Sequence, residues 1–495
     1  MTHPWLRRTL GIAVFLLAYG ARSWVPHTTP AAALGPRPDA LEYVAGAQAI
    51  AQEGRYFLQV GPDRVRPRYP PGFSLLLAGA VKLGVAPAEL WRVSALFGAA
   101  LAVLVGFLAA AAVGRLRPGR GELLAFAVAG GLWALAPAAV AIGRAVMSDE
   151  PATLFLLGSI ALTLRWAGRP TALTAGAAAV AWAVALAIRP VAAIPAGLVL
   201  LPIALAGWRT AEPRKRAKSL AAALGGAAVV VGLVIGLLLR SGLPAWPWDG
   251  YAFWVPERFG PAGSPFALDY ALRGDPTVPR RVAGQTIGHF EFVARSALGL
   301  PGLPVHHSPG FAWPGLGLAV VAVALGRKRW RRPLEAGVPS LALGLGLWLL
   351  FHGVFYSLYF FAASRFLLVV FATSAVAVGA GLGVLASRPG RGAPALALGL
   401  ALAVTTATAV PLARLQPHAT RPDAVPTADS VAAWLASSDD ERLGKPVPFD
   451  PVHVQALGLL PTARAAQILR WGTLPPTDHV VRLQAHGATG SPEIP

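Results

Sequence analysis

Apolar residues in this chain are grouped in long blocks that contain almost no charge. Each block holds about 16 to 25 residues, close to the ~20 that a helix needs to cross a hydrocarbon layer of ~30 Å. The pattern therefore predicts about eleven membrane-spanning helices. Their expected ranges are 9–25, 90–114, 122–142, 151–166, 171–187, 190–207, 219–239, 311–326, 336–358, 366–386 and 393–410.

The polar parts of the chain are unevenly distributed between these blocks. We expect an all-α polytopic membrane domain over residues 1–410, with two long connections at 26–68 and 240–310. The tail at 411–495 is more polar and predicts a small α/β appendage. In the first connection, apolar spacing from Asp39 to Gln52 predicts a helix lying along the membrane surface, and the double proline at 70–71 suits the start of another helix.

Basic residues decide the expected orientation. Lys and Arg gather before the first block and after every second one, for example at 7–8, 214–218 and 327–332. Short cytoplasmic loops carry this excess, so we expect the N-terminus in the cytoplasm and the C-terminus in the periplasm of a bacterial inner membrane. Because the formal net charge of +20 reflects topology, it indicates the lipid bilayer and no nucleic acid as partner. The first block is read as an uncleaved anchor.

Cysteine is absent from the sequence, which excludes disulfides, thiolate catalysis and thiolate metal ligands. Three histidines in the second long connection, His289, His306 and His307, have no spacing typical of a metal site. We therefore expect no metal and no required cofactor. His352 is the clearest titratable residue near the centre of a block, and its structural interpretation is a hydrogen bond to the backbone of a neighbouring helix.

Carboxylates stand at two expected outer ends of helices. Asp39 and Glu42 are one helical turn apart, so both would face the same direction at the start of the surface helix. The alternative is an N-cap with its capping-box partner. Ser148, Asp149 and Glu150 stand at the turn before the fourth block, where Ser148 or Asp149 could cap the helix and the acidic residues could complement its dipole.

Arginines on the expected outer side oppose the trend of positive charge inside. Arg68 precedes Tyr69 and the double proline, Arg189 precedes Pro190, and Arg365 opens a late block. Long side chains near helix ends often extend toward lipid headgroups, which is the structural explanation for such residues. A planar guanidinium is also well suited to binding a phosphate.

The order of these motifs resembles the GT-C membrane glycosyltransferases. The resemblance covers roughly residues 5–410 and is closest to the bacterial branch with aminoarabinose transferases and rhizobial lipopolysaccharide-core sugar transferases; protein O-mannosyltransferases are more distant. The motifs that carry it are the acid opening the surface helix, Gly54-Arg55-Tyr56, Arg68-Tyr69-Pro70-Pro71-Gly72-Phe73, Met147-Ser148-Asp149-Glu150-Pro151, Arg189-Pro190 and Arg365.

The resemblance implies a function and a set of residue roles. It implies sugar transfer from a polyprenyl-phosphate donor, which is a substrate, to a lipid, glycan or protein acceptor at the periplasmic face. Relatives often carry two adjacent acids where this chain has Asp39 and Ala40, so either Asp39 or Glu42 is the implied catalytic carboxylate. The implied binders of the donor phosphate are Arg68, Tyr69 and Arg365, and the implied site-shaping residues are Asp149, Glu150 and Arg189.

Elementary chemistry agrees with these roles. Displacing a polyprenyl phosphate from an anomeric carbon requires a base for the acceptor hydroxyl and cations for the departing phosphate. A single displacement would invert the anomeric configuration. Three other functions remain open: a transporter or flippase for lipid-linked glycans, an O-antigen-type ligase, and a non-catalytic scaffold. A transporter would normally place ionisable groups near the centre of the membrane, whereas here they lie at the ends of the blocks.

Overall fold

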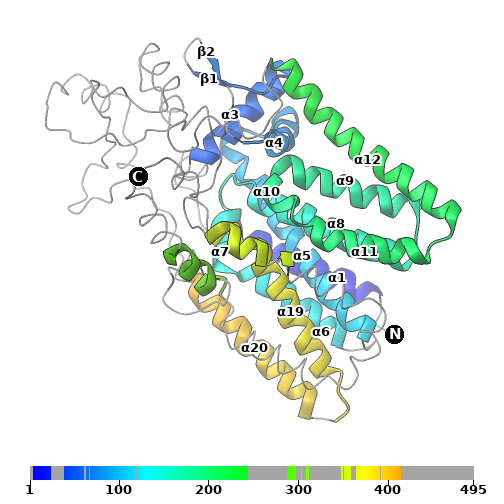
Figure 1. Cartoon of the computed structure of the whole chain (residues 1–495). Coiled ribbons are helices and arrows are strands. Elements are labelled where there is room, and N and C mark those ends of the chain that lie inside the picture. The colour runs from blue at the N-terminus through cyan, green and yellow to red at the C-terminus, as the bar shows by residue number, and fades with distance from the viewer. Residues whose placement is uncertain are drawn as a thin grey trace, which may run out of the picture. The chain divides into compact units, whose positions relative to one another are not determined.

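The structure is a computed structural model and is helical almost throughout its described residues (Figure 1). It divides into two compact units, which are described separately below. The described residues are 4–23, 38–60, 63–65, 67, 69–116, 121–242, 287–296, 303, 308–310, 347–348, 350–357, 364–390 and 392–413.

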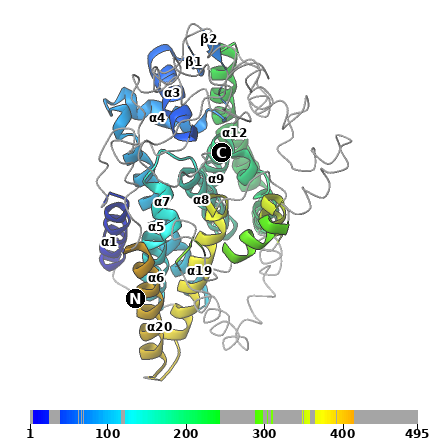
Figure 2. The ribbon, with the colours of Figure 1, turned by 90° about the vertical axis from the view of Figure 1, so that its left-hand side faces the viewer.

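The first unit is a bundle of apolar helices. Within it, α6 packs against α1, α19 and α20, and α8 packs against α9 and α11 (Figure 1, Figure 2). Its helices are α1 (Pro4–Ser23), α5 (Trp91–Leu116), α6 (Gly121–Leu135), α7 (Pro137–Gly143), α8 (Asp149–Gly168), α9 (Ala172–Ile188), α10 (Pro190–Ala193), α11 (Gly197–Thr210), most of α12 (Pro213–Arg240), the 3-10 helix η3 (Ser364–Leu367), α19 (Leu368–Ala386) and α20 (Gly392–Ala413).

Small residues let α6 and α19 approach closely. A Cβ added to Gly383 would lie 2.6 Å from the carbonyl oxygen of Gly121, and one added to Gly379 would lie 2.7 Å from that of Ala125. Helices in lipid gain little from apolar burial against each other, so close backbone approach through glycine is a common basis for their packing. These glycines therefore account for the tight α6–α19 contact.

Prolines explain two breaks in the helices of this unit. Pro137 is the first residue of α7, and the axis bends by 59° between α6 and α7 because proline offers no N–H to continue the ladder. Pro190 likewise opens α10, and the preceding Arg189 takes an extended φ of −150°, as residues before proline prefer. The first break lies inside the predicted span 122–142. The second lies between the predicted spans 171–187 and 190–207, where a turn was expected.

The second unit contains a pair of packed helices and a short hairpin. Helix α3 (Pro38–Glu53) packs against α4 (Gly72–Lys82), and the 3-10 helix η1 (Pro87–Glu89) follows α4. Strand β1 (Leu58–Val60) pairs antiparallel with β2 (Asp63–Val65), with Leu58 opposite Val65. The helices predicted after Asp39 and after the double proline are both present, whereas the hairpin was not predicted. The location of α3 at the membrane surface stays a prediction.

The predicted blocks can be compared with the described helices. Among the described residues, five helices are long and apolar enough to cross a membrane, or six if the bent pair α6–α7 is one span, so the chain is a multi-pass membrane protein. Block 190–207 differs from the prediction because α10 ends after one turn and α11 has only 14 residues. Block 311–326 and most of the tail at 411–495 lie outside the described residues, so eleven spans and the α/β appendage remain predictions.

Candidate functional site

A buried ion pair joins α1 to the start of α8. Nη2 of Arg22 donates to Oε1 of Glu150 at 2.5 Å, and Nε donates to Oε2 at 3.2 Å. Nη1 of the same guanidinium donates to the carbonyl oxygens of Ala18 and Ala134. Both side chains are essentially inaccessible, and a buried arginine requires such a complete set of partners. Glu150 is therefore held as the partner of Arg22.

Two glycines make room for this ion pair. Cβ atoms added to Gly98 of α5 or Gly143 of α7 would each collide with Arg22 and Glu150, at separations below 3 Å. Neither glycine has a positive φ, so space rather than backbone conformation explains them. The end of α7 is thus pressed against the ion pair.

A second ion pair lies at the same end of α8. Nη1 of Arg189 donates to Oδ1 of Asp149 at 2.5 Å, and the Asp149 carboxylate is buried. The other carboxylate oxygen, Oδ2, is enclosed and has no hydrogen-bond partner. Ser148 is the N-cap of α8 but makes no side-chain capping hydrogen bond, so the capping interpretation is wrong for this serine. Asp149 therefore has one oxygen engaged and one available.

An aromatic ring connects two of the predicted arginines. The guanidinium of Arg189 lies 5.2 Å from the centroid of Phe366, and that of Arg365 lies 5.1 Å from the same centroid. The Tyr356 ring stacks on Phe366, with centroids 4.6 Å apart and planes 9° apart. Cation–π contacts of this kind orient arginines without neutralising them. The structure thus brings Arg189 and Arg365 together with Asp149.

Arg144 lies between α7 and α8, and the sequence motifs predicted no role for it. Its side chain is only 6% exposed, and its Nε is enclosed without a hydrogen-bond partner. No hydrogen bond or ion pair from the part of the chain that the structure describes reaches its guanidinium. Burial alone lowers the pKa of Arg144 from its ordinary value, and no charged neighbour contributes. The group still carries its charge at neutral pH.

These residues form what we call the α8-head cluster. It contains two more arginines than carboxylates, and all of its members belong to the first unit. The helix η3, which carries Arg365, packs against α7, whose last residue directly precedes Arg144. The cluster consists of Arg22, Arg144, Asp149, Glu150, Arg189 and Arg365.

The second unit brings together Glu42 and Tyr69, two more of the predicted site residues. Glu42 is fully buried in α3, and its Oε1 accepts a hydrogen bond from the backbone N–H of Tyr69 at 3.1 Å. The Tyr69 ring lies 5.0 Å from that of Tyr43, and its carbonyl oxygen accepts a hydrogen bond from the Tyr56 hydroxyl at 2.8 Å. Glu42 therefore fixes the chain just before the double proline.

The remaining predicted residues are only partly described. Asp39 is the second residue of α3, but its side chain is outside the described part of the structure, as is Arg68. His352 donates from Nδ1 to the carbonyl oxygen of Trp348, 3.0 Å away on its own helix. The prediction of a bond to a neighbouring helix is therefore wrong, because the carbonyl one turn earlier is nearer. His306 and His307 also lie outside the described residues.

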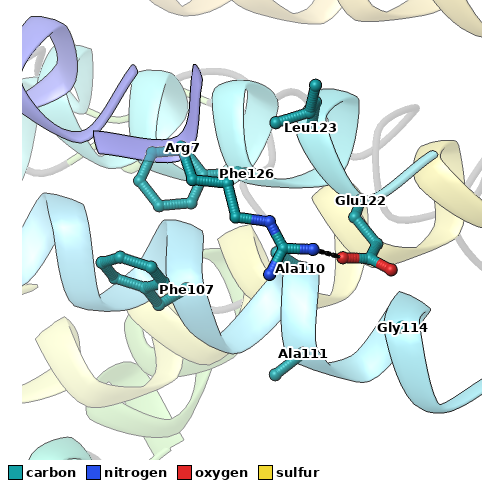
Figure 3. Close-up of a pocket in the computed structure, with 8 residues that line it drawn as sticks. All are labelled: Arg7, Phe107, Ala110, Ala111, Gly114, Glu122, Leu123 and Phe126. Atoms are coloured by element: carbon teal, nitrogen blue, oxygen red, sulfur yellow. Dashed lines mark hydrogen bonds and ion pairs between the residues drawn. The ribbon is translucent and has the colours of Figure 1, made fainter. Parts of the chain in front are cut away.

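Among the described residues, no group of three or more His, Asp or Glu side chains could hold a metal ion. A pocket of about 420 Å³ lies near the N-terminal end of α1, where Arg7 forms an ion pair with Glu122 (Figure 3). The rings of Phe107 and Phe126, whose centroids are 5.0 Å apart, line the same pocket. Arg7 is fifteen residues from Arg22 along α1, or about 22 Å in a helix, so this pocket is remote from the α8-head cluster.

Sequence reasoning missed Arg22 and Arg144. Arg22 carries a signal that could have identified it, because it is an arginine at the outer end of the first predicted span, against the expected distribution of charge. Arg144 stands five residues before Asp149 and has the same signal. Neither the partner of Arg22 nor the absence of a described partner for Arg144 could be derived from sequence spacing.

Comparison with known proteins identifies the fold. No protein-family model and no curated protein sequence matches the chain. Among solved structures, the apo oligosaccharyltransferase of Archaeoglobus fulgidus superposes with a TM-score of 0.51 at 14% identity, over 89% of this chain and 59% of that one. The fold is that of the GT-C glycosyltransferases. This chain spans about three fifths of the length of the oligosaccharyltransferase.

Two further structures with looser superpositions are similar over most of this chain. ArnT from Cupriavidus metallidurans, bound to undecaprenyl phosphate, has a TM-score of 0.43 at 17% identity and covers 95% of this chain and 73% of its own. The arabinosyltransferase EmbB from Mycobacterium smegmatis has a TM-score of 0.38 at 13% identity and covers 90% of this chain and 45% of its own. The fold shared with the oligosaccharyltransferase agrees with the fold that the motif order implied.

Proposed function

We propose that the chain is an integral membrane glycosyltransferase that moves a sugar from a polyprenyl-phosphate carrier to a lipid, glycan or protein acceptor at the periplasmic face. The observation that carries the proposal is the GT-C fold, shared with an oligosaccharyltransferase over 89% of this chain. The α8-head cluster supports it, because a surplus of arginines at the end of a membrane helix suits an anionic substrate.

The proposed reaction is a single displacement. The acceptor oxygen bonds to the anomeric carbon of the donor sugar while the bond from that carbon to the phosphate oxygen breaks. A carboxylate of α3 receives the acceptor proton; we assign this role to Asp39, and Glu42 is the alternative. The electron pair of the broken bond stays on the polyprenyl phosphate, which gains negative charge. Cationic groups stabilise that charge as it develops.

The residues proposed to bind the donor phosphate are Arg68, Tyr69 and Arg365. Arginine is suited to this task because its planar group donates two parallel hydrogen bonds to phosphate oxygens and stays charged. Arg365 is held beside Phe366, and Arg189 beside the same ring is paired with Asp149. Glu150 contributes through Arg22 to the shape of this end of α8. The proposed reaction requires no metal and no cofactor.

The deciding experiment is sugar transfer by the purified protein in lipid nanodiscs. Wild type should transfer sugar from a polyprenyl-phosphate donor, whereas Asp39→Asn should lower kcat by about 100-fold or more, since general bases contribute roughly 10²–10⁴. Glu53→Gln is a matched control on the exposed end of the same helix and should keep full activity. Equal rates for wild type and Asp39→Asn would exclude this carboxylate as the base.

Two product measurements test the remaining parts of the proposal. NMR of the product should show an inverted anomeric configuration, and retention would contradict a single displacement. Addition of a chelator should leave the rate unchanged. Activity that is lost with chelator and restored by one divalent ion would contradict the metal-free reaction.

A further inference from the structure

Arg144 is a buried cation without a described counter-charge. Its side chain is 6% exposed, its Nε is enclosed without a partner, and only burial perturbs its ionisation. Burying a charge is costly unless it is paired and hydrogen-bonded, so structural arginines acquire partners. Arg22 shows what such a residue looks like in this protein, with four hydrogen bonds to a carboxylate and two carbonyl oxygens.

The carboxylates nearest in sequence are already engaged. Glu150 uses both oxygens to accept hydrogen bonds from Arg22, and Asp149 accepts from Arg189 through Oδ1. Oδ2 of Asp149 has no partner, but no hydrogen bond or ion pair between described residues joins it to Arg144. The helix η3, which carries Arg365, packs against α7, the helix that ends just before Arg144. An external anion would supply the counter-charge that Arg144 lacks among the described residues.

The chemistry of the position indicates a phosphate. Guanidinium groups match the geometry of phosphate oxygens, and several arginines together favour a multiply charged group. Two segments that carry members of the cluster, Asp149–Gly168 and Ser364–Ala386, are long and apolar enough to cross a membrane, so an anion attached to a lipid tail can reach it from the bilayer. We propose that Arg144 binds the phosphate of an isoprenoid lipid carrier. This inference rests on the proposed function for the identity of the carrier.

The test compares variants of the full-length protein in phosphatidylcholine nanodiscs. Undecaprenyl phosphate without sugar is the probe, and its binding is measured by titration and by the rise in thermal unfolding midpoint. Arg144→Gln should weaken binding about tenfold or more, the effect of losing a charge-assisted hydrogen bond, and Arg144→Lys should restore part of it. Arg169→Gln, an exposed arginine at the other end of α8, is the matched control and should bind as wild type does.

A second measurement separates binding from a structural role. Without ligand, Arg144→Gln should unfold at the same temperature as wild type or higher, because an unpaired buried charge has been removed. Arg22→Met should unfold at a lower temperature, since it leaves Glu150 unpaired. If Arg144→Gln lowers the midpoint as Arg22→Met does, or binds undecaprenyl phosphate as tightly as wild type, the proposal is wrong.

Further arms identify the source of the phosphate and keep this inference distinct from the proposed function. Inorganic phosphate and phosphatidylglycerol should each compete poorly; equal competition by either would contradict recognition of an isoprenoid carrier. Sugar transfer by wild type is measured in parallel. If wild type transfers sugar but Arg144→Gln binds undecaprenyl phosphate as tightly as wild type does, only the Arg144 site is wrong. Arg144-dependent binding without any transfer by wild type supports the site and overturns the transferase.

Discussion

Arg22 and Glu150 are 128 residues apart in the sequence and form a two-point ion pair with no solvent access. The pair fixes the C-terminal end of α1 to the first turn of α8. Glu150 precedes Pro151 in this turn, where a carboxylate also complements the helix dipole. The position of Asp149, the preceding residue, therefore depends on a contact whose primary role is to hold two helices together.

Breaking this ion pair should destabilise the protein. Glu150→Gln leaves the Arg22 guanidinium buried without a counter-charge and should cost about 3–5 kcal/mol of unfolding free energy. The measurement is denaturant unfolding in mixed micelles. Arg22→Met should cost a similar amount, for the complementary reason that the Glu150 carboxylate is left alone.

The double variant tests whether the two residues act as a pair. Arg22→Met combined with Glu150→Leu removes both charges, so its cost should be smaller than the sum of the two single costs by at least about 1 kcal/mol. Additive costs would show that the two side chains contribute independently.

Gly98 provides a test of packing around the same pair. Gly98→Ala places a methyl group where Arg22 and Glu150 lie and should cost about 1–3 kcal/mol, as overpacking does in a dense core. The matched control is Gly131→Ala in α6, where no atom lies within 4 Å of the added Cβ. That change should be neutral or stabilising by about 0.5–1 kcal/mol, because alanine is the better helix former. Equal losses in both variants would exclude the steric explanation.

The elements that sequence predicted well are those with a local cause. The apolar block at 90–114 forms α5, and the apolar spacing after Asp39 leads to α3. Each pattern depends only on the apolar positions within a single helix. The break between α10 and α11 and the Arg22–Glu150 pair were missed. The break coincides with Pro195, a local signal that the apolar pattern hid, whereas the ion pair joins segments 128 residues apart, and no spacing along the chain encodes such a contact.

The candidate site shows the same division. Motif order selected Asp149, Arg189 and Arg365, which the structure gathers around Phe366. It did not reveal that Glu42 is fully buried against the backbone of Tyr69, because burial is a property of the packed unit. The sequence therefore predicted that three of these residues lie close together, but not the contacts that each one makes.

Arg189 should be sensitive to a conservative change. Its guanidinium bonds to Asp149 and also lies over Phe366, and lysine lacks the planar group that does both. Under the proposed function, Arg189→Lys should lower kcat/KM by about tenfold, corresponding to ~1.4 kcal/mol. Transfer kinetics with varied donor concentration give this value. Wild-type kinetics in Arg189→Lys, together with a clear loss in Arg189→Gln, would show that charge alone suffices.

Glu42 should act by positioning rather than by proton transfer. Glu42→Gln retains an oxygen that can accept from the Tyr69 N–H but loses the charge, so about 1 kcal/mol of stability should be lost. Donor KM should rise while kcat stays close to wild type, in contrast to Asp39→Asn. Glu53→Gln is the control, because its ion pair with Arg64 is exposed. A kcat loss in Glu42→Gln as large as that of Asp39→Asn would make Glu42 the catalytic carboxylate.

The orientation of the chain can be tested with single cysteines, because the natural sequence has none. Glu53→Cys replaces an exposed residue at the end of α3, and Arg169→Cys replaces one at the end of α8. With short basic loops in the cytoplasm, a membrane-impermeant maleimide should label position 53 in intact spheroplasts. It should label position 169 only after lysis.

The length of α8 makes this labelling informative about the candidate site. Its 20 residues span about 30 Å, enough to cross the hydrocarbon layer, so we expect Asp149 and Arg169 on opposite sides of it. Protection of position 169 therefore places the α8-head cluster on the periplasmic side, where a lipid-linked sugar exposed at the outer leaflet can reach it. Labelling of position 169 in intact cells would place the cluster in the cytoplasm, and the periplasmic reaction would have to be abandoned even if the protein transferred sugar.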